Sequence, residues 1–157
     1  MISRVTAATF AGLFAALLLV GAAHSQGQQQ VVKNASVQFS TGDEGKDNTT
    51  AFTVTVANAG GKLLERVFDD RRKAQPGTIS TFWLNRTRAE TADRLKGSHI
   101  TITILPKGEE RWTINDARLK VNFMTGPSRS WHWGPFTLQS SAGKPASVEF
   151  VLEDDGL

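Results

Sequence analysis

The segment His99–Leu105 reads HITITIL, an unbroken alternation of apolar and polar residues. Ile100, Ile102 and Ile104 stand two positions apart, with threonines between them. Successive side chains of a β-strand point to opposite faces, so the isoleucines share one face and the threonines the other. The segment therefore predicts a half-buried strand of an antiparallel sheet.

The same two-residue period recurs on both sides of this segment. Further alternating runs lie at residues 37–39, 51–57, 62–68, 77–85, 117–123, 131–138 and 147–152. Turns containing Gly, Pro or Asn separate them, and Ala89–Gly97 predicts one helical turn or a loop. About eight short strands without a long helical period predict an all-β fold, a single antiparallel β-sandwich of two facing sheets.

The N-terminus predicts a secretory signal. Arg4 precedes the uncharged run Val5–Ala23, and small residues at Ala23 and Ser25 precede a cut before Gln26. A membrane anchor is the alternative, because this run is just long enough to cross a bilayer. The small residues favour cleavage, so no transmembrane span is expected afterwards. The predicted organisation is a signal peptide at 1–25, a polar tether at 26–33 and the sandwich domain at 34–157.

The cysteine count and the distribution of charge limit where the protein works and what it binds. The chain has no cysteine, so an exported protein of this kind has no disulfide and suits a secreted or periplasmic bacterial setting. The basic residues gather in Lys62–Lys96, which holds nine of them against five acids. This density is too low for a nucleic-acid binder, so the stretch either faces water or meets an acidic partner.

The turn Ser40–Thr50, STGDEGKDNTT, predicts a calcium site. Calcium takes six to eight oxygen ligands, several of them carboxylates. The candidate ligands are the side chains of Asp43, Glu44, Asp47, Asn48 and, from a second acidic segment, Asp116. The alternative is an ordinary solvated turn whose acids are neutralised by Lys46 or Arg111, because Asp, Asn and Gly are common turn residues.

Trp131 and Trp133 stand two positions apart and are expected to share one face of a strand. They form either a stacking platform that contacts a sugar or lipid ligand, or part of the core, with His132 in water. Trp83 and Trp112 are expected in the core. No zinc-binding His spacing, nucleophile elbow or phosphate-binding loop occurs, so the expected function is non-catalytic.

Three motifs carry a family resemblance: TGDEGKDNT at 41–49, LKGSHITITI at 95–104 and RWTINDARLKV at 111–121. Over Val37–Phe123 their order resembles the PLAT (lipoxygenase-homology) β-sandwich, although Asp116 lies one place later than the acid of that family. The resemblance implies a non-catalytic module that docks on a lipid surface or another protein, in some cases with calcium.

Two other binding hypotheses remain open. One is a carbohydrate-binding module that stacks glycans on Trp131 and Trp133. The other is an envelope protein that binds or inhibits another exported protein, with Lys62–Lys96 against an acidic partner.

Overall fold

The computed structural model describes residues 29–153 apart from 49, 69–73, 106–107 and 142–143. The predicted signal peptide lies outside the described residues. The described part contains these elements in chain order: β1 (Val32–Thr41), β2 (Ala51–Asn58), β3 (Gly61–Phe68), β4 (Ile79–Arg86), α1 (Ala92–Leu95), β5 (His99–Leu105), β6 (Glu110–Phe123), β7 (Arg129–Trp133), β8 (Phe136–Ser140) and β9 (Ala146–Val151). None of its helical residues forms a segment with the length and apolar character that a bilayer crossing requires.

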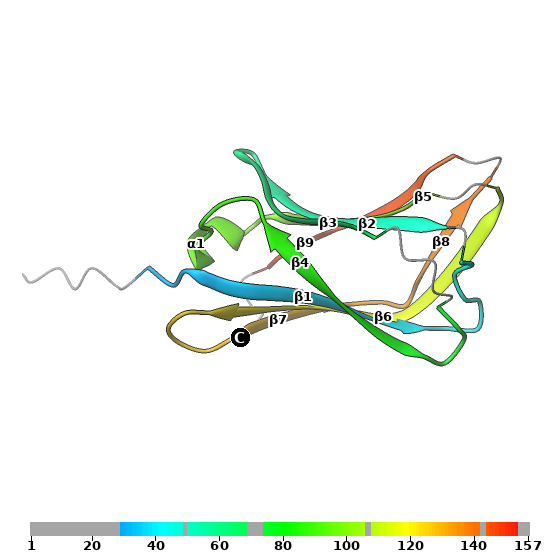
Figure 1. Cartoon of the computed structure of the whole chain (residues 1–157), viewed down its shortest axis with the longest axis horizontal. Coiled ribbons are helices and arrows are strands. Elements are labelled where there is room, and N and C mark those ends of the chain that lie inside the picture. Colours follow the sequence, from blue (N-terminus) through cyan, green and yellow to red (C-terminus); the bar gives the residue numbers. More distant parts are fainter. Residues whose placement is uncertain (1–28, 49, 69–73, 106–107, 142–143, 154–157) are drawn as a thin grey trace, which may run out of the picture.

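All strand pairs are antiparallel, in the order β7-β6-β1-β4-β3-β2-β5-β9, with β8 also paired to β6. In Figure 1, β2, β3, β5 and β9 form one layer, β1, β6 and β7 form the other, and β4 runs between them. The predicted antiparallel all-β fold is confirmed. The predicted sandwich of two separate sheets is not confirmed. The pairs Leu64↔Arg86 and Glu65↔Asn85 connect β3 to β4 and join the layers into one nearly barrel-shaped sheet.

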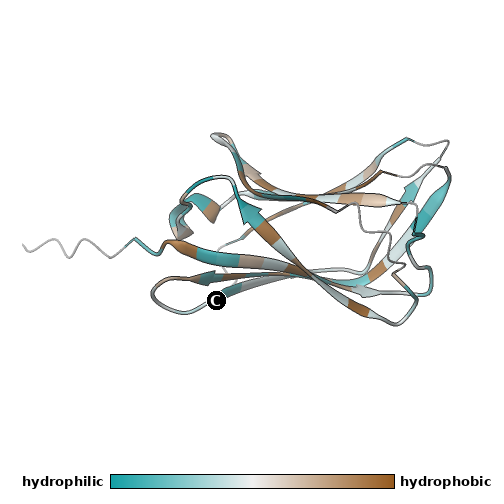
Figure 2. Cartoon of the chain, in the orientation of Figure 1, coloured by the Kyte–Doolittle hydropathy of each residue, from teal (hydrophilic) through white to brown (hydrophobic). Residues whose placement is uncertain are grey.

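The alternation that predicted the strands decides which side chains are buried. In β5 the three isoleucines are fully buried, while Thr101 and Thr103 are half-buried on the opposite face. β2 continues the pattern, with Thr53 opposite Thr103 and Thr55 opposite Thr101. Figure 2 shows hydrophobic residues on strands of both layers. Buried apolar side chains of both layers belong to one core cluster, including Val37 and Leu119 of one layer and Val54 and Ile102 of the other, so the apolar faces of the two layers are turned toward each other.

Four aromatic rings join the layers in the middle of the core. Phe39, Phe52, Phe82 and Trp112 pack with ring centroids 4.9–6.1 Å apart, mostly edge to face. Trp112 is 1% exposed, as the sequence predicted. Burial of rings of this size is a major source of stability in a domain without disulfides.

The prediction that Trp83 lies in the core is wrong. Its neighbours on β4, Phe82 and Leu84, face the core, and successive residues of a strand alternate between faces. Trp83 therefore points outward and is 53% exposed.

Candidate functional site

The acidic turn is organised around a buried lysine. Lys46 is 3% exposed, and its ammonium nitrogen donates to the carbonyls of Asp47 and Thr50 at 2.9 and 2.7 Å. The Thr50 hydroxyl in turn donates to the buried Glu110 carboxylate at 2.6 Å, and the Asp47 amide donates to it at 3.2 Å. Carbonyls that would otherwise be available to a bound cation are thus hydrogen-bonded to Lys46.

The acids of the turn have protein partners or face water. The Glu44 carboxylate lies 2.7 Å from Arg111 Nε, and Asp43, Asp47 and Asn48 are exposed. Asp116 lies on β6 beside His132, 3.4 Å from its Nδ1. Within the described residues, no three His, Asp or Glu side chains gather in a group suited to a metal. This arrangement fits calcium poorly, and calcium binding at the turn stays a prediction.

A groove lies where the strand order ends. β7 and β9 are the terminal strands, and between them is a cavity of about 580 Å³. We call it the edge groove; it is lined by Ser130, Trp131, His132, Trp133, Glu149, Phe150, Val151 and Glu153. Trp131 and Trp133, the predicted ligand contacts, are therefore both at this site.

No described strand pairs with the edge of β9 that faces the groove. The Leu152 amide donates to the Ser98 carbonyl, which makes this a hydrogen-bonded pair of the β5–β9 register. Such pairs alternate along an antiparallel ladder, so Phe150 and Val148 also bond to β5. The N–H and C=O groups of Glu149 and Val151 consequently point away from β5, toward the groove.

The edge of β7 is open in the same way. The Thr41 amide donates to the Thr78 carbonyl. The backbone N–H and C=O groups of odd-numbered β1 residues therefore point toward β4, and those of even-numbered residues point toward β6. The same alternation continues through β6 to β7, so the backbone N–H and C=O groups of Trp131 and Trp133 point toward β6. The N–H and C=O groups of Ser130 and His132 are left facing the groove. Among the described strands, none pairs with either long side of the edge groove.

Aromatic rings form the bottom of the groove. Trp133 stacks on Phe150 with a centroid distance of 5.4 Å and an interplanar angle of 18°. Trp131 is 7% exposed, and its Nε1 donates to the Glu153 carbonyl at 2.8 Å, which joins the end of β9 to β7. We call Trp131, Trp133 and Phe150 the aromatic floor. Because Trp131 is buried and Phe150 covers one face of Trp133, the pair does not offer two exposed coplanar rings to a sugar.

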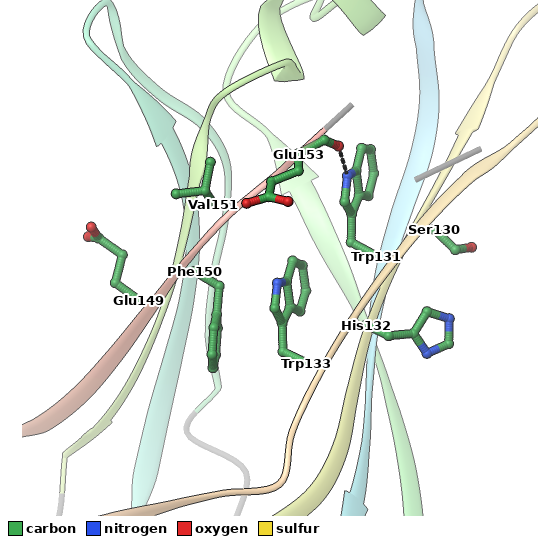
Figure 3. A pocket seen from close by; sticks show the side chains of 8 residues that line it. All are labelled: Ser130, Trp131, His132, Trp133, Glu149, Phe150, Val151 and Glu153. Carbon is green, nitrogen blue, oxygen red and sulfur yellow. Dashed lines mark hydrogen bonds between the residues drawn. The ribbon is translucent and has the colours of Figure 1, made fainter. Parts of the chain in front are cut away.

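One carboxylate, that of Glu153, lies over the groove and makes it acidic (Figure 3). Figure 3 shows the Glu153 carboxylate between β9 and the indole rings, whereas the side chains of Glu149 and His132 point away. Glu149 instead accepts from Thr101 at 3.3 Å and lies 2.9 Å from His99 Nδ1. No Lys or Arg is among the described residues that line the groove.

Sequence reasoning missed Phe150 and Glu153 as site residues. The alternation of SVEFVL predicts that Phe150 faces inward, but no local pattern indicates that it meets Trp133 across two sheet edges. Glu153 follows the last strand and carries no motif of its own. Only the strand order, a property of the whole chain, brings these residues together.

The chain is weakly similar to a region of one solved structure. No protein-family model matches the chain, and no curated protein matches it. A crystal structure of a lipoxygenase variant is weakly similar, with a TM-score of 0.46 and 13% sequence identity. The match covers 75% of this chain and 16% of that chain.

Proposed function

We propose that this chain is an exported, non-catalytic, PLAT-like binding module that holds an extended segment of another protein in the edge groove. One observation carries the proposal: two strand edges that no other described strand pairs with face the same groove above the aromatic floor. Unpaired edges are templates for another strand, and proteins normally cover, shorten or charge them. A segment that adds to such an edge gains main-chain hydrogen bonds, while pockets for alternate side chains select its sequence.

The groove chemistry supports binding rather than catalysis. A nucleophilic site needs a base within hydrogen-bond reach of the nucleophile. The side chain of His132 points away from the groove and lies beside Asp116 and Arg118 on the outer face of the sheet. Within the described residues that line the groove, no Ser–His or carboxylate pair is set up for reaction.

A second candidate is docking on a lipid surface through the outer face of β3 and β4. Trp83, Ile79 and Val67 are 53%, 65% and 60% exposed, and Arg66 donates to the Trp83 carbonyl at 2.8 Å. Exposed apolar side chains with a basic neighbour suit the interface of an anionic membrane. Sedimentation with phosphatidylserine vesicles tests this function. Trp83→Ala should reduce the bound fraction if this face docks, and equal sedimentation of both proteins would reject it.

The groove function is tested with synthetic nonapeptides that alternate Thr and Val and differ only in the central residue, which is Lys, Leu or Glu. Binding is followed through the indole N–H signals in NMR spectra of the purified protein. We expect at least one peptide to bind with a Kd below about 1 mM and to shift the signals of Trp131 and Trp133. The signal of Trp83, on the outer face of β4, is the internal control.

Proline variants test whether the backbone edge makes the contact. Ser130→Pro and Glu149→Pro each remove a free edge N–H without removing a donor of the existing ladder. Each lost hydrogen bond is worth about 1 kcal/mol, so we expect at least one proline variant to bind about 5- to 10-fold more weakly. Ser130→Ala and Glu149→Ala keep the N–H and should bind within about twofold of the parent. Absence of binding by all three peptides would refute the function.

A further inference from the structure

We infer that the edge groove selects a segment with a positively charged side chain, which lies on the aromatic floor beside Glu153. The inference rests on the proposed function and names the chemistry of its ligand: an extended peptide with a Lys or Arg at the position that faces the groove.

The charge of the lining residues is the first argument. Two carboxylates, Glu149 and Glu153, and no Lys or Arg belong to the lining. Glu149 is directed to His99 and Thr101 on the outer face of β5 and β9. Glu153 is exposed, its side chain lies over the groove in Figure 3, and no ion pair joins it to another described residue. A cationic side chain is the complement that such a groove lacks.

The aromatic floor is the second argument. Ring faces of Trp and Phe attract cations within about 6 Å of the ring centroid, and Trp does so best. The aliphatic stem of a Lys or Arg also packs on apolar surface while its charged end reaches a polar partner. The half-buried Trp133, next to a single carboxylate, therefore offers a basic side chain both an aromatic ring for its stem and an anion for its charged end (Figure 3).

The strand edges determine how that side chain is presented. A segment paired with β7 or β9 has alternate side chains on opposite faces, so one face points to the aromatic floor and the other to water. Phe150 and Trp133 accept apolar groups on this inner face, and the Glu153 carboxylate accepts a cation. The favoured segment thus has a basic residue among apolar ones at two-residue spacing.

The three nonapeptides test the inference. The parent protein should bind the Lys-centred peptide about 10-fold more tightly than the Leu-centred one, and the Glu-centred peptide should bind most weakly; 10-fold corresponds to about 1.4 kcal/mol. Glu153→Gln should reduce the Lys preference to below about twofold. Glu149→Gln, the matched control on the outer face, should keep the preference. Calorimetry gives the Kd values, and circular dichroism checks that both variants are folded.

Each contrary result has a distinct meaning. Equal affinity for the Lys, Leu and Glu peptides would overturn the charge selection and leave the strand-binding function standing. Absence of binding by all three would overturn both. If Nα-acetyl-lysine methylamide alone bound as tightly as the Lys-centred peptide, the site would be one for a small organic cation, and the peptide assignment would be overturned.

Discussion

Removal of the buried ammonium group of Lys46 should destabilise the protein, and the hydrogen bonds of Lys46 allow the size of the loss to be worked out. Lys46→Met keeps an unbranched apolar side chain of similar length but removes the ammonium group. The Thr50 carbonyl then loses its hydrogen bond from Lys46, and the Asp47 carbonyl keeps only the one from the Thr50 amide at 3.3 Å. Thr50 is 1% exposed, so water does not readily replace the bond that its carbonyl loses. The loop would lose the bonds that hold it near Glu110.

The size of the effect follows from these two hydrogen bonds. Bonds that involve a charged group contribute about 1.5–3 kcal/mol each, and removal of a buried lysine recovers part of its desolvation cost. We therefore expect the free energy of unfolding to fall by about 2–3 kcal/mol. A domain of this size loses about 3–6 °C of Tm per kcal/mol, so the expected drop is roughly 10 °C.

Thermal unfolding followed by circular dichroism measures this drop. Lys120→Met is the matched control, because Lys120 lies exposed on the outer face of β6, and it should change the Tm by less than about 2 °C. A drop for Lys46→Met no larger than that of Lys120→Met would refute the argument that the turn is built around Lys46.

Three further predictions concern the groove, the outer face and the turn. Trp131→Phe removes the bond to the Glu153 carbonyl and should lower the Tm by about 3–6 °C, for a loss of about 1 kcal/mol; an unchanged Tm would show that this bond does not join β7 to β9. Trp83→Ala should cost no more than about 0.5 kcal/mol, whereas Trp112→Ala should cost about 3–5 kcal/mol, and similar losses in denaturant melts would contradict the assigned orientations. Calcium binding at the turn predicts a Tm that rises with calcium over EGTA, by about 2.7 kcal/mol of added stability at 100 times the Kd, and an identical Tm in both would reject it.

The strands could be predicted because their evidence is local. Ile100, Ile102 and Ile104 alternate with threonines, and no other residue is needed to conclude that they share a face. The same rule, applied strictly, would have placed Trp83 outside, since it stands between Phe82 and Leu84. The usual burial of large aromatic side chains predicts the opposite orientation, and that prediction is wrong at this position.

The groove could not be predicted because it depends on strand order. Two tryptophans two positions apart indicated a shared face, but Trp133 meets Phe150 only because β7 and β9 are the two ends of the order. Lys46 is a similar case. In the sequence it is one charge among several in a polar turn, and its burial results from contacts with Asp47, Thr50 and, through Thr50, the distant Glu110.

Backbone hydrogen exchange tests most directly whether the edge groove is open and takes a strand. The amides predicted to exchange rapidly in the free protein are those of Ser130, His132, Glu149 and Val151, while the residues between them on each strand exchange slowly. Saturation with the Lys-centred nonapeptide should slow the rapid amides of at least one edge. Protection of all four amides in the free protein, or unchanged rates at saturation, would contradict the account.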